Sequence, residues 1–125
     1  MKYLLDVNML LGLIWRDQAA HKRTMAWLAG KEVALCPLTE LGFLRISTNA
    51  KVMGATMERT RRLLETFAAD IQAERIPADL DALDSHPRTS AEVTDNYLAD
   101  LAAKHGMKLA TLDKLLKHPA VELVS

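Results

Sequence analysis

Cysteine and aromatic residues are scarce in this sequence of 125 residues. The single cysteine, Cys36, excludes a disulfide within the chain and is typical of proteins from a reducing compartment. Aromatic residues make up 5% of the chain, and we expect Trp15 and Trp27 in the core or an interface, since single-strand stacking platforms usually expose several aromatic side chains. We therefore expect Cys36 to be a small core residue and the protein to be cytoplasmic.

The chain also lacks an excess of charge and a long apolar run. Lys and Arg number 16, as do Asp and Glu, so binding of nucleic acid would depend on a local patch of charge. The apolar run Met9–Trp15 is too short to span a bilayer. Asp6 and Asn8 interrupt the apolar stretch that a secretory signal would need. We therefore expect no membrane partner.

The composition is that of a folded globular protein. Hydrophobic residues make up 50% of the chain and charged residues 26%, which favours a real core over disorder. No repeat, linker or low-complexity tract is visible, so residues 1–125 are expected to form one domain.

Short apolar runs alternate with segments of helical periodicity. The predicted strands are Tyr3–Val7, Val33–Cys36, Glu74–Pro77, Lys108–Thr111 and Val121–Val124. The predicted helices are Met9–Arg16, Ala19–Ala29, Pro37–Thr48 with Leu41, Leu44 and Ile46 buried, a long helix capped by Thr56, a turn at Ala78–Leu83, Ser90–Lys104 and Leu112–Lys117. This order predicts a three-layer α/β/α fold with a mainly parallel sheet of about five strands.

Three acidic residues follow strands of the predicted sheet. Asp6 lies near the end of the first strand, Glu40 begins the helix after the second, and Asp113 follows the fourth. In parallel sheets ligands bind outside the carboxyl ends of the strands. Like charges about 4 Å apart repel by roughly 4 kcal/mol at an effective dielectric of 20, so such acids need protons or cations. Carboxylate oxygens suit Mg²⁺ or Mn²⁺, which activate water against phosphodiesters. The alternative is that each acid simply caps a turn or helix.

Four motifs occur in order along nearly the whole chain: LLDVN, LTELGFLR, TDNYLADLAAKHG and LATLDKLL. Together they resemble the PIN domain, and more narrowly the VapC-type toxin of bacterial type II toxin–antitoxin pairs. The resemblance implies a Mg²⁺- or Mn²⁺-dependent endoribonuclease that hydrolyses RNA with metal-activated water. It also implies a homodimer that is inhibited by a cognate antitoxin.

The resemblance assigns functional residues by position in these motifs. It places the catalytic and metal-binding acids of the family on Asp6, Glu40, Asp95 and Asp113. Asn8 and Thr111 match small polar residues beside the first and last acids, and we expect them to form hydrogen bonds rather than to bind metal. The stretch from Lys114 to Lys117 holds no acid where some relatives carry a fifth.

The third motif contains two acids, Asp95 and Asp100. On a helix they lie roughly 140° apart around the axis, so only one is expected to face the site. Asp95 precedes Leu98 by three residues and extends the apolar stripe toward the helix start. Asp100 is expected on the wetter side, within reach of Lys104.

Two other functions are compatible with an acidic sheet edge. A phosphoacceptor receiver domain would need an acid pair at the first strand and an acceptor Asp at the end of the third. This chain has one acid at the first strand, and Asp79 lies beyond Pro77, which ends the third. The second alternative is a PIN-like domain that acts only as a binding scaffold, against which the four acids argue.

Overall fold

Five parallel strands form one sheet in the order β3-β2-β1-β4-β5 in the computed structural model, which describes residues 1–125. The strands are β1 (Lys2–Leu5), β2 (Glu32–Leu35), β3 (Glu74–Arg75), β4 (Lys108–Thr111) and β5 (Val121–Leu123). The helices are α1 (Val7–Ile14), α2 (His21–Leu28), α3 (Pro37–Thr48), α4 (Met57–Asp70) and α5 (Val93–Lys104), with 3₁₀ turns η1 (Ala82–Asp84) and η2 (Ser90–Glu92). The predicted fold class is confirmed.

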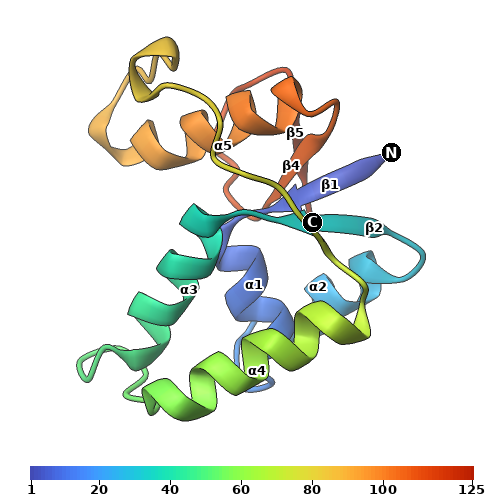
Figure 1. The fold of residues 1–125 in the computed structure, drawn as a ribbon, viewed down its shortest axis with the longest axis vertical. Helices are drawn as coiled ribbons and strands as arrows, with labels where there is room; N and C mark the ends of the chain where they lie inside the picture. The colour runs from blue at the N-terminus through green and yellow to red at the C-terminus, as the bar shows by residue number, and fades with distance from the viewer.

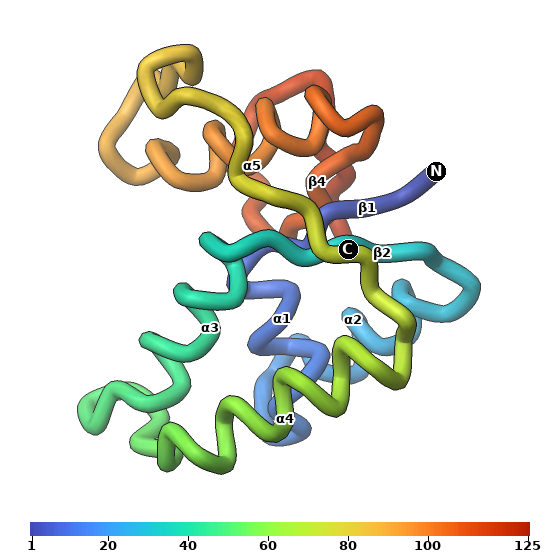
Figure 2. Tube along the Cα trace, viewed as in Figure 1, coloured from blue at the N-terminus to red at the C-terminus, as the bar shows by residue number.

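The central strand β1 pairs with β2 on one side and with β4 on the other. Tyr3 lies opposite Val33 in β2, and Leu4 lies opposite Leu109 in β4. The blue β1 and the orange-red β4 run together in Figure 2, although they come from opposite ends of the chain. A receiver domain has the strand order 2-1-3-4-5, so this sheet order shows that the receiver alternative is wrong.

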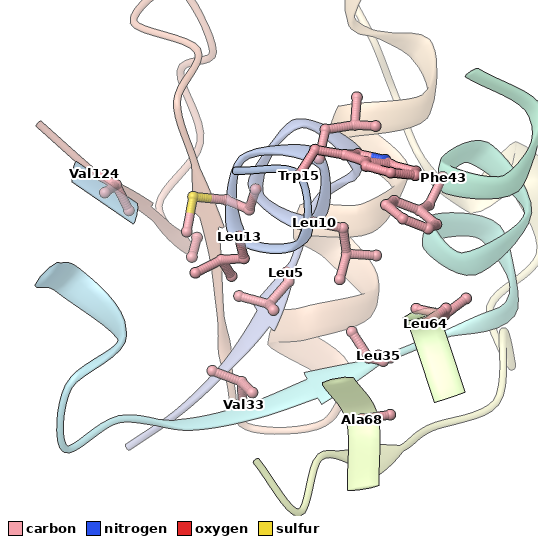
Figure 3. Close-up of a cluster of buried hydrophobic side chains, with 13 residues drawn as sticks. Leu5, Leu10, Leu13, Trp15, Val33, Leu35, Phe43, Leu64, Ala68 and Val124 are labelled. Atoms are coloured by element: carbon pink, nitrogen blue, oxygen red, sulfur yellow. The ribbon is translucent and has the colours of Figure 1, made fainter. Parts of the chain in front are cut away.

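Helices cover both faces of the sheet, with α1 to α4 on one side of β1 and β2 and α5 on the other (Figure 1). Successive side chains of a strand point to opposite faces, so Leu5 packs toward α1 and α3 while Leu4 packs toward α5. The larger of the two cores contains Leu5, Leu35 and the stacked rings of Trp15 and Phe43 (Figure 3).

The first helix begins two residues earlier than the sequence predicted. Val7 lies in α1 and not in the first strand, because the Asp6 carboxylate accepts a hydrogen bond from the Met9 N–H and caps the helix. Asp6 therefore separates a strand from a helix within one apolar run, and it is buried between them.

The predicted helix at Leu112–Lys117 is wrong, because the segment forms a turn. The Asp113 carboxylate accepts a hydrogen bond from the Leu115 N–H, which favours a turn over a helix. A segment of six residues also gains too little from propagation to offset helix nucleation.

Two further details differ from the prediction. Leu41 was expected to be buried in α3 but is 61% exposed, because Phe43 and Ser47 occupy the inward face of that helix. The helix expected at Ser90–Lys104 begins with the 3₁₀ turn η2 and becomes α-helical only at Val93. Cys36 is buried, as predicted.

No helix in the structure combines the length and apolar character that crossing a membrane requires.

Gly42 allows α3 to approach α1 closely. A Cβ atom at this position would lie 2.6 Å from Cγ2 of Val7, which is a stiff side chain. We expect Gly42→Ala to lower the free energy of unfolding by about 1–3 kcal/mol through overpacking, even though alanine favours helices by about 1 kcal/mol. Chemical denaturation measures this effect. Adding Val7→Ala to this variant should recover most of the lost free energy of unfolding, because it removes the side chain that clashes. Equal stabilities of Gly42→Ala and the wild type would show that α3 and α1 do not approach closely here.

Candidate functional site

The site lies at the point where the sheet changes direction between β1 and β4. From β1 the chain builds β2 and β3 on one side, and it later adds β4 and β5 on the other. Ligands in open parallel sheets bind outside the strand ends at such a point. The Asp6 N–H donates to the Ala110 carbonyl across this gap, at 3.3 Å, so the ends of the two strands are held together.

Asp6 is the most buried acid of the site, with 2% of its surface exposed. Its Oδ1 accepts a hydrogen bond from the Met9 N–H at 2.8 Å. Burial raises the pKa of Asp6 to about 6, while hydrogen bonds from Thr111 and Met9 oppose the rise and the charges of Asp95 and Asp113 add to it. The Asp6 carboxylate is therefore repelled by the charges of two other acids, and no cationic side chain offsets this repulsion.

Asp95 and Asp113 approach Asp6 from different elements. Asp95 lies in the first turn of α5, and burial, followed by the charge of Asp113, raises its pKa. Asp113 follows β4 in a turn, where its N–H donates to Thr111 Oγ1 at 3.1 Å and its Oδ1 accepts from the Leu115 N–H at 2.9 Å. We name Asp6, Asp95 and Asp113 the carboxylate cluster.

The structure gives the fourth predicted acid, Glu40, a different neighbour. Its Oε2 lies 3.2 Å from Nη2 of Arg75, at the end of β3, and Glu40 is not among the charges that act on Asp6. The structure therefore brings together three of the four predicted acids. Sequence reasoning did not identify Arg75, because nothing in its surroundings in the sequence indicates a partner 35 residues away.

The two predicted polar neighbours also differ in position. Thr111 is fully buried and contacts both Asp6, through a side-chain hydrogen bond, and the backbone of Asp113. Asn8 is exposed on α1 and lines a hollow of about 310 Å³ together with Asp113. Thr111 is thus placed to orient two acids, whereas Asn8 faces the space beside them.

Asp100 points away from the carboxylate cluster. His118 Nδ1 accepts from the Ala120 N–H, so its Nε2 donates to Asp100 Oδ1 at 2.6 Å. The sequence suggested Lys104 as the partner of Asp100, but Lys104 lies 3.7 Å from Asp79 instead. Asp100 therefore holds α5 to the loop before β5, and its partner lies too far along the chain for helical spacing to show.

The carboxylate cluster fits a hard divalent cation by the chemistry of its donors. All three side chains offer only oxygen, and none of the ion pairs in the structure includes one of them. The structure contains no group of three or more acidic, histidine or cysteine side chains already arranged to bind a metal ion. Burial raises the pKa values of Asp6 and Asp95, and a bound Mg²⁺ or Mn²⁺ would stabilise their ionised carboxylates.

Known proteins resemble this chain in sequence over almost all of its length. The model of the PIN domain family matches residues 3–122. Ribonuclease VapC38 of Mycobacterium tuberculosis is 38% identical over 119 residues, which cover 88% of this chain and 84% of the relative. Ribonuclease VapC39 of the same organism is 32% identical over 135 residues, covering 96% of this chain and 94% of the relative.

Solved structures share the fold at lower sequence identity. VapBC2 of Rickettsia felis, solved bound to a promoter DNA fragment, aligns with a TM-score of 0.64 and 17% identity over 98% of this chain and 97% of that chain. FitAcB of Neisseria gonorrhoeae aligns with a TM-score of 0.58 and 21% identity over 90% and 88%. Both the sequence motifs and the sheet thus lead to one conclusion: the chain belongs to the PIN domain family.

Proposed function

We propose that this protein is a Mg²⁺- or Mn²⁺-dependent endoribonuclease and the toxin of a type II toxin–antitoxin pair. The observation that carries the proposal is the carboxylate cluster, in which three acids without a cationic partner meet at the ends of β1 and β4. Relatives named Ribonuclease VapC support the nuclease activity. The structural neighbours VapBC2 and FitAcB support a cognate antitoxin as protein partner.

The residues proposed to hold the cation are Asp6, Glu40, Asp95 and Asp113. When bound, one or two cations would offset the negative charge of the RNA phosphate and lower the pKa of the attacking water. Glu40 stands apart from the other three, since its carboxylate is paired with Arg75 in this structure.

The protein supplies orientation to this chemistry. The Met9 N–H and Thr111 fix the Asp6 carboxylate, and Thr111 also binds the N–H of Asp113. The hollow beside Asn8 and Asp113 offers space for a nucleotide next to the cluster. No side chain needs to act as the nucleophile, because water attacks the phosphorus.

We further propose that residues 1–125 form one domain, which acts in the cytoplasm as a homodimer. Sedimentation of the purified chain tests the dimer, and a monomer at micromolar concentration would contradict it. Co-purification with the product of an adjacent open reading frame tests the antitoxin partner.

Metal dependence provides the direct test of the proposed activity. Because the acids of the cluster repel one another, Mn²⁺ is expected to raise the melting temperature of the metal-free protein. Cleavage of RNA should require Mn²⁺ or Mg²⁺ and should return when the metal is added back after EDTA. Calorimetry and a gel assay with purified RNA measure the two effects.

The same experiment distinguishes the enzyme from a binding scaffold. A scaffold would show no RNA cleavage with either metal, whatever the change in melting temperature. Undiminished cleavage in excess EDTA would instead show a nuclease that does not use the carboxylate cluster in this way.

A further inference from the structure

Two adjoining hollows extend from the carboxylate cluster along α1. The first, of about 310 Å³, lies beside Asp113, Asn8 and Gly12 and reaches Gln18. The second, of about 800 Å³, begins at Gln18 and reaches Arg59. Because Gln18 lines both, we treat them as one surface and name it the α1 tract.

The far end of the α1 tract carries two guanidinium groups with unused hydrogen-bond donors. Arg16 and Arg59 both line the second hollow. The arginines that form ion pairs are Arg62, Arg75 and Arg88, so neither cation in the hollow is neutralised by a carboxylate. Such a pair of cations at one end of a hollow favours an anionic ligand.

Arg59 is held in place by an aromatic ring rather than by an acid. Its guanidinium carbon lies 5.3 Å from the centre of the Trp15 ring. That ring stacks on Phe43 and donates a hydrogen bond to Ser47 Oγ at 2.9 Å. The guanidinium is therefore pre-positioned with its donors free, and its planar fork matches a phosphate group.

The length of α1 sets the distance between the two ends of the tract. Trp15 lies nine positions after Asp6, which corresponds to roughly 13 Å at about 1.5 Å per helical residue. A stacked single strand covers this distance with about four nucleotides at about 3.4 Å each. Between the ends, Asn8 and Gln18 offer amide groups that can contact sugars or bases.

We propose that the α1 tract binds the RNA strand beside the cleaved bond, with Arg16 and Arg59 contacting a phosphate about four nucleotides from the carboxylate cluster. This inference rests on the proposed ribonuclease function and names a binding subsite for its substrate. Asp17 also lines the second hollow, which leaves a formal charge of +1 from two arginines and one aspartate. The contact is thus expected at the two guanidinium groups and not over the whole hollow.

Binding of short and long RNA tests the proposal in an Asp6→Asn parent, in which cleavage is blocked. Fluorescence anisotropy with Mn²⁺ would compare Arg16→Gln/Arg59→Gln with the matched control Arg23→Gln/Arg45→Gln, whose arginines are exposed and line neither hollow. For a 12-nucleotide RNA we expect at least a tenfold loss from the first pair and less than twofold from the control. For a 3-nucleotide RNA both pairs should bind like the parent.

The salt dependence of RNA binding provides a second test of the contact between the two arginines and the phosphate. Loss of the contact with this one phosphate should reduce the slope of log Kd against log salt by about 0.7, the value expected per neutralised phosphate of a single strand. Arg59→Lys keeps the charge and should retain more binding than Arg59→Gln. Thermal melts of each variant confirm that the fold is kept.

Four outcomes separate the inference from its alternatives. Equal losses of RNA affinity in the two double variants, or no binding of the parent to the 12-nucleotide RNA, would overturn the proposal that the α1 tract binds RNA. A polyglutamate peptide that binds the parent as tightly as RNA, through the same arginines, would overturn its assignment to RNA. If RNA binding depends on Arg16 and Arg59 but the wild type cleaves no RNA with Mn²⁺, the tract is supported and the proposed enzyme is not.

Discussion

Asp6→Asn is expected to abolish RNA cleavage and, at the same time, to raise the stability of the metal-free protein at neutral pH. We expect cleavage to fall by at least about a hundredfold, equivalent to about 2.7 kcal/mol of transition-state stabilisation. The reason is that Asp6 is proposed as a cation ligand at the centre of the carboxylate cluster. A gel assay at saturating Mn²⁺ measures the loss.

The gain in stability follows from the raised pKa of Asp6. The pKa of Asp6 is about 6 in the folded chain against an ordinary value of 3.8, so the folded chain binds a proton that the unfolded chain has released between these pH values. The free energy of unfolding therefore falls as pH rises from about 4 to about 6 and stays low above that. At about 1.4 kcal/mol per pKa unit, the ionised carboxylate costs about 3 kcal/mol.

Asparagine removes this cost without removing the helix cap. Its Oδ1 can accept from the Met9 N–H, and Asn and Asp are equivalent N-caps. Its Nδ2 can donate to Thr111 Oγ1 or to the remaining acids. The melting temperature of the metal-free variant should therefore exceed that of the wild type by about 5–10 °C at pH 7.5.

Two comparisons make this prediction specific. The difference in melting temperature should shrink toward pH 4, where the wild-type carboxyl is protonated, and should also shrink when Mn²⁺ is added. Asp84→Asn, at an exposed acid outside the cluster, should change neither cleavage nor stability. A less stable Asp6→Asn protein at neutral pH would show that the carboxylate is already compensated.

Local signals in the sequence were sufficient for the sheet and for two acids of the carboxylate cluster, Asp6 and Asp113, whereas Asp95 was assigned by the family resemblance. Short runs between the helical segments located all five strands, although β3 consists of the charged residues Glu74 and Arg75. Asp6 and Asp113 follow strands of the sheet, at the edge where ligands bind in parallel sheets. The boundary at Asp6 was misplaced because capping and strand termination use the same residue type. Three of the four predicted acids meet in the structure, namely Asp6, Asp95 and Asp113.

The features that the sequence did not reveal depend on partners far along the chain. Glu40 is paired with Arg75, and Asp100 with His118, and neither pair follows from helical or strand spacing. Burial likewise separates neighbours that look alike: Leu116 is buried, whereas Leu115 is 82% exposed. Tertiary contacts determine the partners and the burial of these residues, and the hydrophobicity pattern of the sequence does not predict such contacts.

Asp95 and Asp100 are carboxylates of one helix, and the same substitution is expected to affect RNA cleavage strongly at Asp95 and weakly at Asp100. Asp95→Asn should reduce metal-dependent cleavage by at least about a hundredfold, because Asp95 acts on Asp6 and Asp113 in the carboxylate cluster. Asp100→Asn should reduce it by less than about fivefold, or less than about 1 kcal/mol, because Asp100 binds His118 away from the cluster.

The free energy of unfolding of the two variants provides a second, independent comparison of Asp95 and Asp100. Burial and the charge of Asp113 raise the pKa of Asp95, so Asp95→Asn should stabilise the metal-free protein at neutral pH and lose that advantage at low pH. Asp100→Asn replaces the carboxylate that accepts from His118 Nε2 with a neutral amide, and we expect it to lower the free energy of unfolding by about 1 kcal/mol. Both variants should be assayed at saturating Mn²⁺ after thermal melts confirm folding. A severe loss of cleavage from Asp100→Asn with a mild one from Asp95→Asn would identify Asp100 as the third acid of the site.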